Sequence, residues 1–336
     1  MLPSAEVLPG GLAAFAQSAE RAMKSRPARA TMAVARREFT LVLRARLSRG
    51  SLTLLVVVAW LPPILLALRA GSIGLASFSE TVALGLAFGE IALPLIGLLG
   101  SADLLAGEAE DNTLVMLVAL PISRASVFAG KLIARSTTLA AAYLAAFGSA
   151  ALAIAAARGI NGLTDYATLA GSGLALTLAC GGIGVALGRA GSGRLRAFGA
   201  ALLAWIVMVF ALDAAILAAV VALAPAPPEQ VGAHGYGESA AQMEMMKLHE
   251  LDSEPGQHRT GATAESAPAA QWLMALDPVD LFRFTVLSGA PTLHERAKMG
   301  LGENDPGWFL LIGAWLMWIA LPLGYALRRF HRTDLR

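Results

Sequence analysis

Six long apolar stretches, separated by shorter polar segments, dominate the pattern of residues along the chain. Each reaches about the 20 residues that a helix needs to cross a bilayer. We expect spanning helices near 51–69, 81–104, 132–157, 167–189, 196–224 and 308–327. Ten-residue segments of alternating hydrophobicity, which a transmembrane β-barrel requires, are not visible. The pattern therefore predicts an all-α polytopic membrane protein with six transmembrane helices.

The composition supports this class and argues against several others. Charged residues make up 15% of the 336 residues, against about 25% in a soluble globular domain. A soluble enzyme, a disordered chain and a nucleic-acid-binding protein are therefore poor fits. The single cysteine, Cys180, lies inside an apolar stretch, which excludes an intrachain disulfide framework.

Basic residues are unevenly shared between the two sides of the membrane that six spans create. Residues 1–50, 105–135, 189–196 and the tail after 327 hold 19 of the 26 Lys and Arg residues. The positive-inside rule places these segments in the cytoplasm. We therefore expect a bacterial inner-membrane protein with both termini cytoplasmic and an acid-rich periplasmic segment at 225–307.

The region before the first span divides into two parts. Residues 1–31 lack the pattern of a signal peptide, and we expect a disordered extension or, alternatively, a true start at Met32. Residues 32–50 carry arginines on one helical face and apolar side chains on another. This pattern predicts an amphipathic helix in the lipid headgroup layer, with an ordinary basic flank of the first span as the alternative. The apolar face comprises Ala35, Phe39, Val42, Leu43 and Leu47.

The loop after the second span carries the strongest functional signal. Three acidic residues precede an apolar run, Leu114 to Leu120, that is too short to span and ends at Pro121. We expect a short surface helix at 107–124 whose acidic entrance meets the unpaired N–H groups of its first turn. Exposed apolar surface of this kind usually docks another molecule, although a helix lying on lipid would have the same pattern.

Four short motifs in and beside this loop carry a family resemblance. They are Gly107-Glu108, Thr113-Leu114, Leu120-Pro121-Ile122-Ser123-Arg124 and Gly130-Lys131. Together they resemble the coupling helix of type-2 ABC transporter permeases, which inserts into a separate cytoplasmic ATPase. The chain has no G-x-x-x-x-G-K-[ST] motif to hold ATP and Mg²⁺, so we expect it to be no enzyme and to carry no cofactor itself. The residues expected to dock the ATPase are Glu108, Glu110, Asp111, Thr113, Leu114, Leu117, Pro121 and Arg124.

Two further segments narrow the resemblance. Residues 276–283 (LDPVDLFR) with Leu287-Ser288-Gly289, and residues 147–154 (FGSAALAI), are similar to the permeases of nitrous oxide reductase maturation, the NosY type. The resemblance implies a homodimer that joins two cytoplasmic ATPases to a periplasmic β-helical protein and serves assembly of the reductase's copper–sulfur centre. A general type-2 exporter of lipid, drug or polysaccharide is the alternative, and a membrane enzyme acting alone is a third for which no motif argues.

The segment before the last span is expected to contact the periplasmic partner. Asp277-Pro278 fits a helix start with Pro at the first position, and Asp280 and Arg283 are spaced to pair across one turn. We expect Asp277, Asp280 and Arg283 to form this contact. A re-entrant element packed within the dimer is an equal alternative.

The insert 226–271 offers candidate metal ligands. Met245 and Met246 lie four and three residues before His249, so all three can share a helical face. Thioether and imidazole groups suit Cu(I), which a copper chaperone would deliver. The apolar face of a short docking helix is the alternative interpretation.

Polar and small residues inside the spans complete the predictions. Glu90 lies ten residues into the second stretch, where a charge is costly in hydrocarbon and usually faces a partner or a wet cavity. We expect it to line the dimer cleft or, alternatively, to be a hydrogen-bonded structural residue. Asp103 is expected to be solvated, Pro94 to kink its helix, and Gly184 and Gly188 to form a packing face.

Overall fold

The computed structural model describes residues 27–44, 46–71, 74–110, 124–188, 193–212, 276–290 and 308–332, with 214, 215 and 218, and every regular element in these ranges is helical. Six helices within these ranges are long and apolar enough to cross a membrane. They are Gly50–Arg69, Phe78–Leu104, Ala125–Arg158, Leu163–Gly188, Arg194–Leu212 and Phe309–Arg329. The predicted all-α class and the six spans are confirmed.

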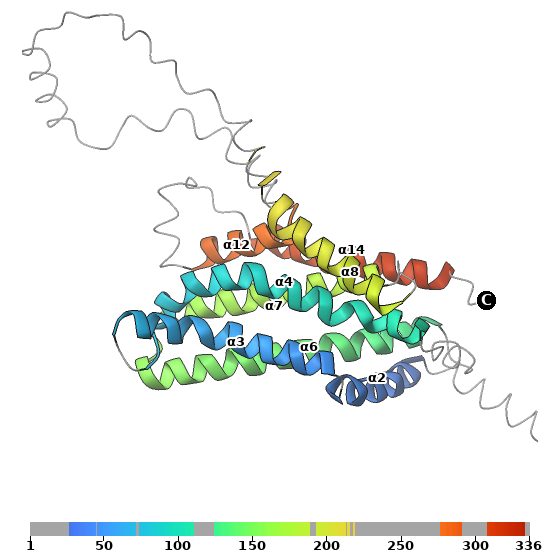
Figure 1. Cartoon of the computed structure of the whole chain (residues 1–336), viewed down its shortest axis with the longest axis horizontal. Helices are drawn as coiled ribbons and strands as arrows, with labels where there is room; N and C mark the ends of the chain where they lie inside the picture. The colour runs from blue at the N-terminus through green and yellow to red at the C-terminus, as the bar shows by residue number, and fades with distance from the viewer. Residues whose placement is uncertain are drawn as a thin grey trace, which may run out of the picture.

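The elements follow in chain order, with the labels of Figure 1. They are α2 (Pro27–Arg44), α3 (Arg46–Arg69), α4 (Phe78–Glu110), α6 (Arg124–Arg158), α7 (Leu163–Gly188), α8 (Arg194–Ile206), its π-helical continuation η1 (Val207–Leu212), α12 (Pro278–Gly289) and α14 (Trp308–Arg332). Pro94, which was expected to kink its helix, lies inside α4, which is continuous from Phe78 to Glu110.

Helices α4 and α7 form the centre of the bundle and approach closely because glycines line their contact. A Cβ on Gly184 would lie 2.4 Å from the carbonyl oxygen of Leu98, and one on Gly188 would lie 2.0 Å from that of Ala102. From the other side, a Cβ on Gly97 would meet α7 backbone. The predicted packing role of Gly184 and Gly188 is confirmed, and small residues let the two backbones touch.

The bundle has two distinct ends (Figure 1). The α2 end carries α2, the last turns of α4 and the C-terminal turns of α14. The loop end carries the connections α3–α4 and α6–α7. The second connection is tight: Gly159 and Gly162 have φ values of 82° and 81°, which glycine adopts without strain. Both described chain ends therefore lie at the same end of the bundle, as an even number of spans requires.

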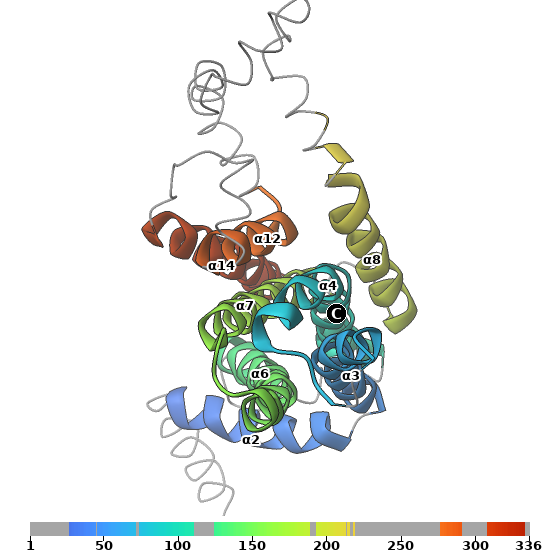
Figure 2. The ribbon, with the colours of Figure 1, turned by 90° about the vertical axis from the view of Figure 1, so that its left-hand side faces the viewer.

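Helix α2 runs across the bundle axis beside α6 (Figure 2), the orientation expected of a helix in the headgroup layer. It begins at Pro27, so residues 27–31 are helical and not part of a disordered extension. It ends at Arg44, and residues 46–50 belong to α3 instead. The expected apolar face is only partly right. Ala35 is buried, but Phe39 is 38% exposed because the face that meets α6 is that of Val34, Ala35 and Glu38.

Helix α4 extends past the apolar stretch to Glu110. Glu108 and Glu110 therefore lie at the C-terminal end of this long helix, and the expectation that they open a new short helix is wrong. The physical reason is helix propensity: Leu, Ala and Glu dominate residues 104–110 and favour continuation of the helix into the polar region. Residues 111–123, the remainder of the expected coupling helix, lie outside the described residues.

Candidate functional site

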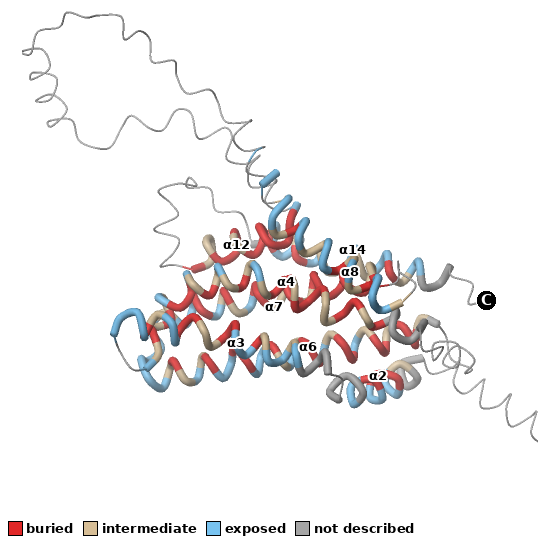
Figure 3. Tube along the Cα trace, viewed as in Figure 1, coloured by how far each residue is buried: buried red, intermediate tan, exposed pale blue. Residues whose placement is uncertain are grey.

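Helix α12 is a short helix packed inside the bundle rather than on its surface. Asp277 is its N-cap and Pro278 occupies its first turn, as predicted. Its 12 residues span about 18 Å, too short to cross a bilayer. Most of its side chains are buried against α4, α7 and α14, and Figure 3 shows this burial along the helix.

Two contacts with α7 give the direction and depth of α12. At its C-terminal end, Thr168 Oγ1 donates to the carbonyl oxygen of Gly289 at 3.3 Å. At its N-terminal end, Asp277 lies near enough to Cys180 to interact electrostatically with the thiol. Thr168 lies near the loop end, and Cys180 lies about 18 Å farther along α7. Helix α12 therefore runs from deep inside the bundle back towards the loop end, which is the re-entrant arrangement.

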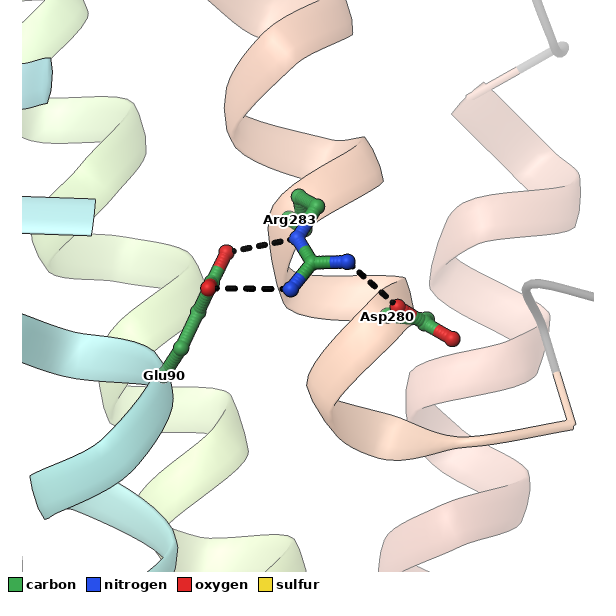
Figure 4. A network of polar contacts seen from close by, with 3 residues as sticks. All are labelled: Glu90, Asp280 and Arg283. Atoms are coloured by element: carbon green, nitrogen blue, oxygen red, sulfur yellow. Dashed lines mark hydrogen bonds and ion pairs between the residues drawn. The ribbon is translucent and has the colours of Figure 1, made fainter. Parts of the chain in front are cut away.

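An ion pair joins this re-entrant helix to α4 (Figure 4). Arg283 donates through Nε to Glu90 Oε1 at 2.8 Å and through Nη2 to Glu90 Oε2 at 3.0 Å. Its Nη1 donates to Asp280 Oδ1 at 3.0 Å, so the predicted pair within one turn is confirmed. The planar guanidinium thus binds two carboxylates from two helices, the forked geometry that only arginine provides.

The position of this network makes it unusual for a membrane protein. Glu90 lies about 18 Å along α4 from Phe78, near the middle of a hydrocarbon layer about 30 Å thick. Its side chain is 16% exposed and that of Arg283 is 36% exposed. Two roles were expected for Glu90, and its hydrogen bonds to Arg283 favour that of a hydrogen-bonded structural residue. A charge pair at this depth is costly and usually functional.

Neighbouring contacts hold α4 and α12 together around this ion pair. Phe282 covers Gly89, where an added Cβ would come within 3.1 Å of the phenyl ring. Trp205 of α8 donates to the carbonyl oxygen of Ile91 at 2.8 Å. Trp315 of α14 donates to Thr285 Oγ1 of α12 at 3.3 Å. The segment of α4 just before Pro94 is therefore held by α8 and α12 as well as by α7, and α12 is bound to α4, α7 and α14.

Two more ion pairs lie at the α2 end, beside the expected coupling loop. Asp103 of α4 binds Arg135 of α6, so the expectation that Asp103 is a solvated helix terminus is wrong. Lys131 of α6 donates to Glu38 of α2 at 2.9 Å, and both side chains are buried. The two helices that flank residues 111–123 are therefore tied to each other, and α6 is tied to α2.

Sequence reasoning missed the role of the Gly130-Lys131 motif as an anchor for α2. A Cβ on Gly130 would lie 2.8 Å from the carbonyl oxygen of Thr31 and 2.8 Å from the Cβ of Val34. The glycine admits the α2 backbone, and the next residue supplies the buried cation. The sequence feature that could have indicated this anchor is Glu38, an acidic residue at the apolar edge of α2.

The remaining predicted site residues fall into three groups. Asp277 and Asp280 are 1% and 4% exposed, so a direct contact with an external partner does not fit them. Arg124 is the first residue of α6. Asp111, Thr113, Leu114, Leu117, Pro121, Met245, Met246 and His249 lie outside the described residues. Within the ranges that the structure describes, no group of three His, Cys, Asp or Glu side chains is placed to hold a metal ion.

Comparison with known proteins identifies the family. The model of the ABC-2 family transporter proteins matches residues 16–335. A relative from Stutzerimonas stutzeri, named "Probable ABC transporter permease protein NosY", is 33% identical over 104 residues, which are 30% of this chain and 36% of the relative. The matched region is therefore about a third of the relative's length. Because the family match extends over almost the whole chain, the protein belongs to the ABC-2 family and is a multi-pass permease component of an ABC transporter, not its ATPase.

Proposed function

We propose that this permease transmits the work of two cytoplasmic ATPases, docked on the loop around residues 111–123, to the re-entrant helix α12, which runs from the middle of the membrane towards the periplasmic end of the bundle. The chain acts as a homodimer, with both termini in the cytoplasm and the loop end facing the periplasm. The transmitted motion serves a periplasmic partner in maturation of the copper–sulfur centre of nitrous oxide reductase.

The observation that carries the mechanical part is the continuity of α4. One unbroken helix links Glu110, beside the proposed docking loop, to Glu90. Glu90 in turn forms an ion pair with Arg283 of α12. The Asp103–Arg135 ion pair couples α4 to α6, the helix on the other side of the loop. A push on the loop therefore acts on both flanking helices, and α4 carries the displacement about 30 Å to α12.

The maturation role rests on the NosY-type motifs at 147–154 and 276–289 and on the 33% identity with a NosY permease over part of the chain. The second motif is the re-entrant helix itself, and its Arg283 completes the ion pair with α4. The segment that resembles NosY permeases is thus the segment that receives the motion in this proposal.

Docking of the ATPase is tested by a charge in the apolar part of the loop. The tagged chain is co-expressed with the ATPase from the same gene cluster, and the ATPase retained on purification is measured. We expect Leu117→Asp to abolish retention, because a carboxylate cannot enter an apolar cleft. Leu248→Asp, the same substitution on the proposed periplasmic side, is the control and should retain the ATPase fully. Equal retention in both variants would reject the docking assignment.

The maturation role is tested in the native host by deleting the chromosomal copy. We expect the reductase polypeptide to accumulate without the absorption of its copper–sulfur centre, and a plasmid copy of the permease to restore it. If the centre forms normally in the deletion strain, the maturation role is refuted. Retention of the ATPase by Leu248→Asp and its loss from Leu117→Asp would then still support an ATP-driven exporter of another cargo.

A further inference from the structure

A second polar site lies at the loop end, away from the ion pair on α12. The last turn of α3, the residues just before α4, the first turn of α4 and the last turn of α6 surround an open cavity of about 640 Å³. Its polar lining is formed by Arg69, Ser77, Glu80 and Arg158. Its apolar lining is formed by Leu66, Ala67, Ala70 and Ala76. Arg69 and Arg158 are the terminal residues of two candidate spans, which places both guanidinium groups at the level where lipid headgroups begin.

The charges of this cavity favour an anion. Glu80 is exposed, but its carboxylate is already engaged by the protein, because it accepts from the backbone N–H of Ser77 at 2.9 Å. Arg158 uses Nε to donate to the carbonyl oxygen of Leu75 at 2.7 Å, which leaves both terminal nitrogens for a ligand. Arg69 is exposed and has no hydrogen bond or ion pair to any residue that the structure describes. Two cations and one carboxylate leave the cavity with one net positive charge.

The apolar residues beside the cavity continue towards the bilayer. Leu65 lies one turn before Arg69 on the same face of α3 and is 39% exposed, and Leu68 is 62% exposed. Figure 3 shows exposed residues where α3 ends, at this end of the bundle. A ligand that combines a singly charged phosphate with hydrocarbon chains matches both the cations and this apolar path.

We propose that the cavity binds the headgroup phosphate of an anionic phospholipid, with phosphatidylglycerol as the matching chemistry. Arg69 and Arg158 contact the phosphate oxygens, the interaction for which the guanidinium fork is suited. The acyl chains lie along the Leu65 and Leu68 face of α3. The site is independent of the proposed coupling mechanism, since it uses neither the 111–123 loop nor α12.

Lipid binding to the delipidated complex of permease and ATPase in detergent tests this assignment. Phosphatidylglycerol, phosphatidylcholine and inorganic phosphate are titrated separately, and bound lipid is measured by native mass spectrometry. We expect Arg69→Gln to weaken phosphatidylglycerol binding about fivefold, a factor typical of one arginine near a lipid surface. Because Arg69 is exposed, the variant should keep the melting temperature of the parent protein. Arg328→Gln/Arg329→Gln at the α2 end is the matched control and should bind normally.

Three results would overturn the proposal. Unchanged binding by Arg69→Gln would remove the arginine from the site. Equal weakening in the control variant would show diffuse attraction to the membrane protein rather than a built site. Displacement of phosphatidylglycerol by millimolar inorganic phosphate, with the same dependence on Arg69, would assign the cavity to soluble phosphate instead of lipid.

Discussion

Neutralising the ion pair between α4 and α12 is the sharpest test of the site. The perturbation is a double-mutant cycle of Glu90→Gln, Arg283→Gln and the combination of both. Each single change leaves one charged group inside the membrane without its main counter-ion. The double change removes both charges and keeps side chains of similar size. We therefore expect the double variant to lose less free energy of unfolding than the two single variants lose together.

The magnitude follows from the geometry. Arg283 makes two charge-assisted hydrogen bonds to Glu90, at 2.8 and 3.0 Å. Polar bonds between membrane helices are worth about 0.6 kcal/mol on average and up to about 1.7, and bonds to charged groups lie at the upper end of such ranges. Two bonds of about 1 kcal/mol each give a coupling free energy of about 2 kcal/mol. Asp280 still accepts from Arg283 when Glu90 is changed, so we expect no larger value.

The assay is thermal unfolding of the purified permease in detergent, followed by tryptophan fluorescence. A loss of about 2 kcal/mol lowers the melting temperature of a chain of this size by about 3 °C. Arg328→Gln, an exposed arginine on α14, is the control and should change the melting temperature by less than about 1 °C. Strict additivity of the two single effects would refute the ion pair as a stabilising link.

Two further predictions concern the packing of the bundle. Gly188→Val should prevent folding or lower the melting temperature strongly, because a Cβ would lie 2.0 Å from the Ala102 carbonyl oxygen. Gly171→Val on the same helix, with nothing within 4 Å, should fold, and monodispersity on size exclusion distinguishes the two. Lys131→Met leaves Glu38 buried without its 2.9 Å partner, so we expect a loss of about 3 kcal/mol and faster protease cleavage of α2. Adding Glu38→Gln should restore much of the protection, and identical cleavage in all variants would contradict the anchor.

The spans were predictable because lipid imposes a simple rule on the chain. Backbone groups must pair within the segment, so length and hydropathy locate a helix without knowledge of its neighbours. The pairs Gly184 and Gly188, and Asp280 and Arg283, were also predictable, because residues three or four apart share a helical face whatever the fold. The start of α12 at Asp277-Pro278 follows from the same local chemistry.

Contacts between distant residues were not predictable from one sequence. Glu90 and Arg283 are separated by 193 positions, and Lys131 and Glu38 by 93. The sequence shows that each charge lies where burial is energetically costly. It does not show the charge's partner, because the partner depends on which helices become neighbours. The expectation that Asp277 and Asp280 face an external partner failed for this reason. The tertiary structure buries both carboxylates, in the re-entrant arrangement that was the alternative expectation.

The amino-acid sequence by itself determined the membrane class, the number of spans, the short helix that begins at Pro278 and the glycine face of α7. These features depend on local hydrophobicity and helical periodicity, which act over a few residues. Only the tertiary structure decided that α12 enters the bundle, that Arg283 reaches Glu90, and that Lys131 holds α2. Those outcomes depend on how helices pack, because the stability of a buried charge is set by the partner that packing brings to it.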